Sequence, residues 1–223
     1  MSVWIKICGV TTIDDARRAL DAGADAVGVN LVPSSKRVVD EATARAIVEA
    51  VGADAEVILV VADRTADDLR ALAARLGVRS VQLHGSEGPE LVRSLAPIAY
   101  QAVRIGSADD VARARTFGGA RLLADAKFGG ALGGTGHTFD WSLVADLARE
   151  RPLVLAGGIT ADNVAAAIER VRPFGVDTAS GVEGESPRHK DPAKMARFVK
   201  EARHAALKLD TTARVDYEPP RIP

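Results

Sequence analysis

The chain has 223 residues, of which 47% are hydrophobic and 26% charged, so it is long and apolar enough to bury a full core. Its 29 basic residues nearly balance 30 acidic ones, and the net charge of −1 provides no basic excess for binding a nucleic-acid backbone. We therefore expect a globular protein with no nucleic-acid partner.

The N-terminal segment MSVWIKICGV lacks the charged start and the long apolar stretch of a secretory signal. Nowhere do ~18 apolar residues run together, which argues against a membrane partner. Cys8 is the single cysteine, so an internal disulfide and a zinc site built on a cysteine pair are excluded. These features predict a cytoplasmic protein without a metal site.

Eight short β-branched runs alternate with helical stretches rich in alanine and arginine. The expected strands are 3–8, 25–31, 56–61, 80–84, 99–104, 121–125, 153–157 and 175–180. The expected helices are 12–22, 40–50, 65–76, 87–95, 107–116, 140–149, 160–170 and 191–204. Strands separated by helices pair in parallel, and eight such units predict an α/β fold, a single (β/α)8 TIM barrel. A doubly wound open sheet is the alternative, but it more often has fewer units and a glycine-rich first turn.

No linker divides the chain, so we place one barrel domain at residues 1–204. Residues 205–223 lose the helical pattern and include three late prolines, which predicts an irregular C-terminal tail.

In such a barrel the chemistry lies at the carboxyl ends of the strands. The first strand ends at Cys8, which shares a face with Lys6, and a lysine near a thiol favours the thiolate. The sixth strand ends at Asp125, where burial would raise the carboxyl pKa and allow it to act as a general acid. The alternatives are a buried structural cysteine and an aspartate that caps a loop or pairs with Lys127.

Further polar residues lie after strand two and at the end of strand four. Arg37 comes after a Pro-Ser-Ser turn, where its guanidinium could bind a carboxylate, although loop arginines are mostly solvated. Gln82 and His84 share a face at the fourth strand end. His84 could shuttle a proton, form a polar wall of the site, or only hold a neighbouring loop in place.

The seventh and eighth expected strands run into glycine-bearing turns, AGGIT (156–160) and TASGVEG (178–184). In this fold the loops after these strands frequently bind phosphate through backbone N–H groups. Structural glycine turns are the alternative. Asp177, just before the second turn, could accept hydrogen bonds from substrate hydroxyls.

The glycine-rich segment 124–141 allows three interpretations: a nucleotide site, a linker or a lid. A nucleotide-binding loop would require glycine at 131 and lysine at 137, whereas the chain has Ala131 and His137. The nucleotide interpretation is therefore disfavoured.

Five sequence blocks together resemble the phosphoribosylanthranilate isomerase family: KICGVTT (6–12), VQLHG (81–85), GGTGHTFDW (133–141), LAGGIT (155–160) and VDTASGVEGESPRHKD (176–191). In order, spacing and content they are far more specific than any single glycine motif. The segment GVNLVPSSKR departs from the family, because it lacks the aromatic residues that members usually carry there.

The resemblance implies that Cys8 is the catalytic base, that Asp125 is the catalytic acid, and that Arg37 binds the substrate carboxylate, with His84 and Asp177 as further substrate contacts. The phosphate would be held by the turns at Gly157, Gly158, Ser180 and Gly181. The implied reaction is an Amadori rearrangement in tryptophan biosynthesis, with a small phosphoribosyl substrate and no metal or cofactor. By the same resemblance, KFGGALGGTGHTF (127–139) is a lid next to the catalytic acid. We further expect a monomer or a homodimer.

Three rival functions remain to be distinguished. A related isomerase of histidine biosynthesis carries aspartate where Cys8 stands, so this cysteine argues against it. Indole-glycerol-phosphate synthase would require an N-terminal extension, whereas this chain starts on its first expected strand. A phosphoribosyl-binding barrel without activity is disfavoured by the presence of both Cys8 and Asp125, and it would bind ligand without turnover.

Overall fold

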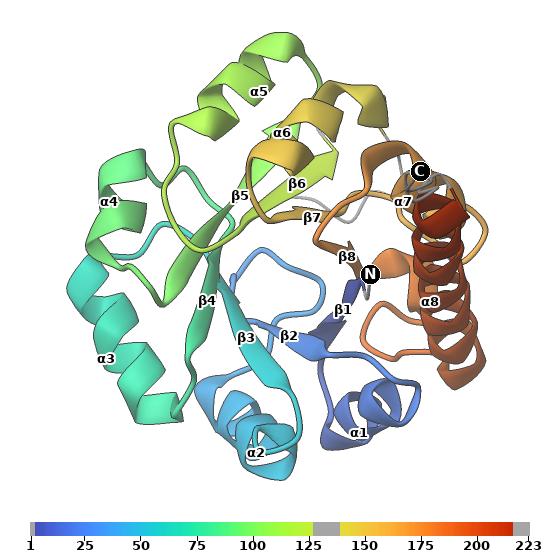
Figure 1. Ribbon diagram of the computed structural model, residues 1–223. Helices are drawn as coiled ribbons and strands as arrows, with labels where there is room; N and C mark the ends of the chain where they lie inside the picture. Colours follow the sequence, from blue (N-terminus) through green and yellow to red (C-terminus); the bar gives the residue numbers. More distant parts are fainter. Residues whose placement is uncertain (1–2, 127–138, 216–223) are drawn as a thin grey trace, which may run out of the picture.

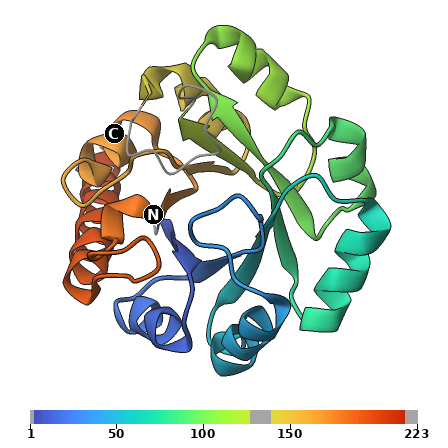
Figure 2. The same cartoon turned by 180° about the vertical axis from the view of Figure 1, so that it is seen from behind.

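The computed structural model describes residues 3–126 and 139–215, with side chains up to residue 209. Parallel strands close into a barrel in chain order, β1 to β8, and helices surround it (Figures 1 and 2). The strands are β1 (Trp4–Val10), β2 (Ala26–Asn30), β3 (Glu56–Val61), β4 (Ser80–Leu83), β5 (Ala99–Ile105), β6 (Leu122–Ala126), β7 (Leu153–Leu155) and β8 (Gly175–Thr178). The predicted (β/α)8 TIM barrel is confirmed.

The helices begin where the sequence offers capping residues. Thr12, Asp40, Thr65 and Ser107 each accept a hydrogen bond from the backbone N–H three residues later, which is worth about 1 kcal/mol per cap. The helices are α1 (Ile13–Asp21), α2 (Glu41–Val51), α3 (Ala66–Leu76), α4 (Pro89–Ser94), α5 (Ala108–Arg115), α6 (Ala145–Glu150), α7 (Val164–Val171) and α8 (Pro192–Val215), with short 3-10 helices η1 (Trp141–Val144) and η2 (Ser180–Val182). Within the described residues, none of the helices combines the length and the apolar character needed to cross a bilayer.

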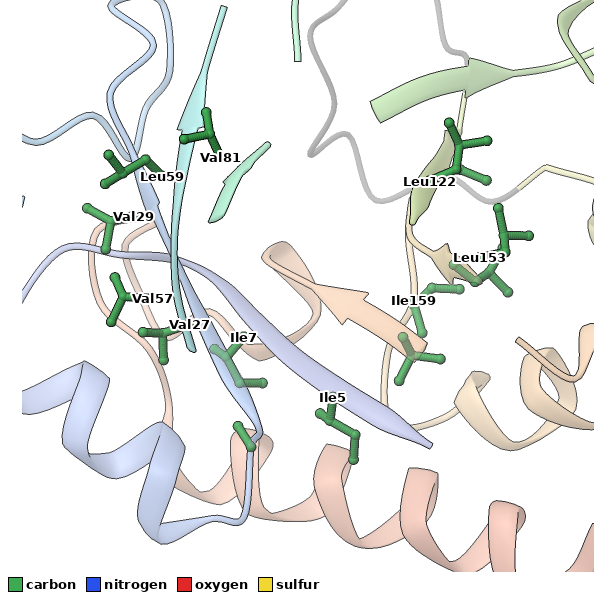
Figure 3. Close-up of a cluster of buried hydrophobic side chains, with 14 of the residues drawn as sticks. Ile5, Ile7, Val27, Val29, Val57, Leu59, Val81, Leu122, Leu153 and Ile159 are labelled. Carbon is green, nitrogen blue, oxygen red and sulfur yellow. The ribbon is translucent and has the colours of Figure 1, made fainter. Parts of the chain in front are cut away.

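The alternation of side chains along each strand separates an apolar layer from the barrel interior. On β1, Ile5 and Ile7 are fully buried in the large core between strands and helices, parts of which Figure 3 shows. On the opposite face of the same strand, Lys6 and Cys8 point into the barrel, where they approach Gly28 of β2. Polar side chains on this inner face therefore meet one another across the barrel.

The C-terminal boundary predicted at residue 204 falls inside a helix. Helix α8 continues to Val215 and packs between α7 and α1, which closes the ring of helices (Figure 1). Ala205 and Ala206 are buried and continue the apolar spacing set by Phe198 and Ala202. The expectation of an irregular tail from residue 205 onward is thus wrong for residues 205–215, and residues 216–223 lie outside the described part of the chain.

Candidate active site

The predicted site residues come from strand ends at the same rim of the barrel. Cys8 lies in β1, Asp125 in β6 and Asp177 in β8, and His84 directly follows β4. Because all strands are parallel, their carboxyl ends meet at this rim. The structure thereby brings together side chains that are far apart in the sequence.

Asp125 is an almost fully buried carboxyl at the end of β6. Its side chain is 7% exposed, its Oδ1 accepts the N–H of Ala126 at 2.9 Å, and its Oδ2 lies 3.5 Å from His84 Nε2. Burial raises the pKa of Asp125 to about 6, against the opposing hydrogen bond from Ala126. A carboxyl of this kind holds a proton over part of the neutral range, as its place after an apolar strand predicts. The alternative partner Lys127 lies outside the described residues.

Cys8 is buried close to a set of cations. Gly28 pairs with it across β1 and β2, and a Cβ there would collide with the Cys8 sulfur. Burial raises the pKa of the Cys8 thiol, whereas Lys6, Lys190 and Arg37 each lower it. Lys6 thus favours the thiolate, as its place on the same strand face predicts, but the net direction of the shift is upward. In the free protein, desolvation of the sulfur, together with the charge of Asp177, outweighs the attraction of the cations.

A buried ion pair lies beneath Cys8 in the barrel. Lys6 Nζ is 2.9 Å from Asp177 Oδ2 and donates a hydrogen bond to Gln82 Oε1 at 2.5 Å. Burial by itself would lower the pKa of Lys6, but Asp177, Cys8 and Tyr100 together raise it above its usual value. Asp177 Oδ1 is buried and has no hydrogen-bond partner among the described residues. That oxygen is the acceptor through which Asp177 can contact a substrate hydroxyl.

His84 lies between Asp125 and Gln82. Its Nδ1 is 3.1 Å from Gln82 Nε2, and its side chain is 15% exposed. Burial and the charges of Lys6 and Arg104 lower the pKa of His84 to about 4. The ring is therefore neutral at neutral pH, which favours the polar-wall interpretation over the proton shuttle.

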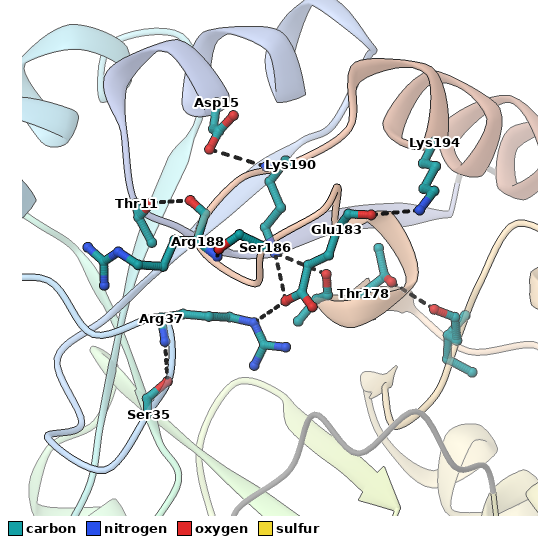
Figure 4. Close-up of polar contacts among 12 residues, drawn as sticks. Thr11, Asp15, Ser35, Arg37, Thr178, Glu183, Ser186, Arg188, Lys190 and Lys194 are labelled. Carbon is teal, nitrogen blue, oxygen red and sulfur yellow. Dashed lines mark hydrogen bonds and ion pairs between the residues drawn. The ribbon is translucent and has the colours of Figure 1, made fainter.

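Arg37 is held in place close to Cys8. Its Nε donates to Glu183 Oε1 (Figure 4). Its side chain is only 12% exposed. Gly9 has φ +72°, and any Cβ at this position would collide with the Arg37 side chain. Arg37 thus lies across the residue that follows Cys8, and the solvated-arginine alternative is wrong.

The two glycine-bearing turns are in contact with each other and with the acid. Gly157 and Gly158 both have positive φ, and a Cβ on Gly157 would collide with Ala126 and Asp125. A Cβ on Gly181 would collide with the Ile159 carbonyl of the neighbouring turn. Ser180 begins η2, the kind of short extra helix that accompanies phosphate sites in this fold.

Several members of this site are not among the residues predicted from the sequence. Glu183 and Lys190 lie beyond β8, where Lys190 Nζ is 3.7 Å from Glu183 Oε1 and donates to the Ala179 carbonyl at 3.0 Å. Both lie in the block 176–191 on which the family resemblance rests, but no strand pattern singles them out as site residues. Tyr100 donates to Gln82 Oε1 at 3.0 Å, and its place on the same face of β5 as Arg104 was the available signal. The predicted lid falls mainly on residues 127–138, which lie outside the described residues.

Comparisons with known proteins point to one family. Residues 5–201 match the family model described as N-(5′-phosphoribosyl)anthranilate (PRA) isomerase. The chain is 41% identical to N-(5′-phosphoribosyl)anthranilate isomerase of Desulforudis audaxviator over 203 residues, which covers 90% of this chain and 98% of the relative. The crystal structure of phosphoribosyl anthranilate isomerase from Thermotoga maritima aligns with TM-score 0.83 and 37% identity, covering 91% of this chain and 99% of that one. A phosphoribosyl anthranilate isomerase solved in complex with reduced 1-(o-carboxyphenylamino)-1-deoxyribulose 5-phosphate aligns with TM-score 0.80 and 35% identity, over 91% of this chain and 99% of its own.

Proposed function

Because the chain belongs to the phosphoribosylanthranilate isomerase family, we propose that Asp125 and Cys8 carry the two proton transfers of that family's reaction. The protein is an isomerase of tryptophan biosynthesis that converts N-(5-phosphoribosyl)anthranilate into 1-(2-carboxyphenylamino)-1-deoxyribulose 5-phosphate. The observation that carries the proposal is the buried carboxyl of Asp125, whose pKa is raised to about 6 at the same rim as the Cys8 thiol.

Asp125 acts first, as the general acid. The furanose ring opens when the bond between the anomeric carbon and the ring oxygen breaks, and the oxygen then needs a proton. Protonated Asp125 supplies it and becomes a carboxylate, while the nitrogen lone pair forms the Schiff base. The raised pKa supports this role, because general acids work best when their pKa lies near the working pH.

Cys8 acts second, as the base. As thiolate it removes the proton from C2 of the Schiff base, the electron pair moves to give an enolamine, and tautomerisation yields the aminoketone. Lys6, Lys190 and Arg37 each lower the pKa of the thiol and so support formation of the thiolate against its burial.

The substrate is held by its two ends. With Nε of Arg37 bound to Glu183, the two terminal nitrogens of its guanidinium are left to bind the anthranilate carboxylate through parallel hydrogen bonds. At the other end, the turns at 157–158 and 180–181 receive the phosphate, and Asp177 Oδ1 accepts from a sugar hydroxyl. Holding a flexible sugar phosphate in this way supplies the part of the rate enhancement that proton transfer does not.

The phosphate site leads to a first expected result. Gly158→Leu is expected to raise KM for the substrate more than it changes kcat, because the new side chain would displace the phosphate from the backbone N–H groups. Gly77→Leu is the matched control, since Gly77 has φ +69° against +68° at Gly158 but lies at the end of α3 in open space. Both variants place a side chain at nearly the same positive φ, so steady-state kinetics that gave equal KM values would place the anion elsewhere.

The pH dependence of kcat/KM provides a second expected result. The productive form pairs a protonated Asp125 with a Cys8 thiolate, although the pKa of the acid, about 6, lies below that of the thiol. As pH rises toward ~6, Asp125 stays protonated while the thiolate fraction of Cys8 grows, so kcat/KM rises. Above pH ~6, the falling fraction of protonated Asp125 cancels the growing fraction of thiolate, and the profile is flat. The profile falls once pH exceeds the pKa of the thiol.

This profile is measured by following the loss of the anthranilate-type fluorescence of freshly generated substrate. The phosphate of the substrate also titrates near pH ~6. The break is therefore assigned by whether it moves in variants that perturb Asp125 without touching the phosphate turns. A profile that showed no break between pH 5 and 7 would contradict the acid role.

We further propose that the protein is a monomer or a homodimer. One aligned structure, at TM-score 0.79, is described as mutually generated monomers of the dimeric enzyme from Thermotoga maritima. A protein of this fold therefore occurs as a dimer and as a monomer. The cytoplasmic location and the lack of a nucleic-acid partner stay predictions from the sequence.

A further inference from the structure

We propose that Gln82 is a positioning residue that fixes His84 in the tautomer with its proton on Nε2, so that this N–H is directed at Asp125. The proposal rests on the acid role proposed for Asp125. It assigns to Gln82 a role exercised through His84, its hydrogen-bonded neighbour.

The orientation of the Gln82 amide follows from the residues on its inner side. Lys6 Nζ lies 2.5 Å from Oε1, and an ammonium group has donors only. Asp177, 2.9 Å from the same Nζ, keeps Lys6 charged. The hydroxyl of Tyr100 donates to the same oxygen at 3.0 Å. A flipped amide would set its NH2 group against the ammonium, so the oxygen faces Lys6 and the nitrogen faces His84.

The tautomer of His84 follows from this orientation. Gln82 Nε2 is 3.1 Å from His84 Nδ1, and an amide N–H requires an acceptor opposite. Nδ1 must therefore be the unprotonated nitrogen, and a neutral imidazole then carries its proton on Nε2. Nε2 lies 3.5 Å from Asp125 Oδ2, a long contact of the kind that shortens when the acceptor becomes charged during catalysis.

An N–H donor in this position favours the carboxylate form of Asp125. It opposes the burial that raises the pKa of Asp125, and it strengthens as the acid gives up its proton. The resulting chain of contacts runs from Asp177 through Lys6, Gln82 and His84 to Asp125, and so connects β8 with β6 across the barrel.

Other charged groups also act on this pair. Arg104 from β5 lowers the pKa of both His84 and Asp125, whereas Glu87 after β4 raises that of His84. Their charges do not depend on the tautomer of His84. A change confined to Gln82 therefore separates the effect of the tautomer from theirs.

The test uses the folded protein labelled with ¹⁵N-histidine and compares three forms. In the unmodified protein, the His84 resonances are expected to show a protonated Nε2 and an unprotonated Nδ1 at neutral pH. With four histidines in the chain, His84 is assigned by its loss in His84→Asn. Gln82→Met is expected to give a mixture of tautomers and to raise the acidic break in kcat/KM by about 0.5–1 pH unit. Tyr100→Phe is the matched control, because it removes a hydrogen bond from the same Oε1 but leaves Lys6 to orient the amide.

The outcomes separate the two proposals. A proton on Nδ1 of His84 in the unmodified protein overturns the positioning role, even if Gln82→Met fails to fold. An unchanged tautomer in Gln82→Met, or an equal change in Tyr100→Phe, overturns it as well. If the tautomer changes in Gln82→Met while the acidic break stays where it was, the positioning of the N–H is supported and the acid role of Asp125 fails instead.

Discussion

Replacing Asp125 by asparagine is expected to lower kcat by at least ~10²-fold, because an amide of similar shape has no proton to give to the ring oxygen. The rate should then be limited by ring opening, so substrate deuterated at C2 should show little primary isotope effect. Kinetics with normal and deuterated substrate check both expectations. A large isotope effect in this variant would place the slow step after ring opening and contradict the assignment.

The same variant distinguishes a loss of catalysis from a loss of folding stability. Burial holds the pKa of Asp125 at about 6, above the usual value of a carboxyl, so its ionised form opposes folding at neutral pH. This penalty is absent below the usual pKa and grows as pH rises toward 6. Asp125→Asn is therefore expected to unfold at a temperature no lower than the unmodified protein at pH 7.

Asp110→Asn provides the control for the loss of a buried carboxylate. Asp110, in the first turn of α5, is 7% exposed, accepts the N–H of Gly106, and is not one of the predicted site residues. Its replacement is expected to lower the unfolding temperature with little change in kcat. A loss of activity as large as that of Asp125→Asn would mean that any buried carboxylate in this barrel supports activity through the fold.

The fold could be predicted from the sequence because its determinants are local. Each strand is a short β-branched run, and residues such as Thr12 and Ser107 mark helix starts by capping the backbone N–H three residues on. The end of the last helix was predicted too early, although Ala205 and Ala206 are buried and continue the apolar spacing of Phe198 and Ala202. Alanine is the strongest helix former, so nothing local ends the helix at residue 204.

The site residues that could be predicted differ from those that could not in the same way. Residues at strand ends, such as Cys8 and Asp125, were found because parallel strands place their carboxyl ends at one rim. Glu183, which holds Arg37, comes from a segment after β8 and meets it only through the closure of the barrel. The direction of the Cys8 pKa shift could not be predicted either. The alternation of side chains along the strand shows that Lys6 lies near Cys8, but not that the sulfur is buried. Long-range contact and desolvation are properties of the closed fold.

Replacing Cys8 by serine is expected to lower kcat by at least ~10²-fold for a different reason than in the aspartate variant. Ring opening can still proceed, since Asp125 is intact and the furanose also opens slowly by itself. Removal of the C2 proton becomes slow, because a serine hydroxyl is a far weaker base than a thiolate at neutral pH. The variant should therefore show a primary isotope effect with C2-deuterated substrate.

The surroundings of Cys8 allow the kinetics of the serine and asparagine variants to be compared directly. The sulfur is packed with Val32 and Val60 in a small apolar cluster, so serine fits the space and the fold should be kept. The cations Lys6 and Lys190 that lower the pKa of the thiol are unchanged, yet they cannot ionise a hydroxyl, which is a much weaker acid. Near-full activity of Cys8→Ser, or equal isotope effects in the serine and asparagine variants, would remove the thiolate from the mechanism. The base would then have to be another group at this rim, while membership of the family would stand.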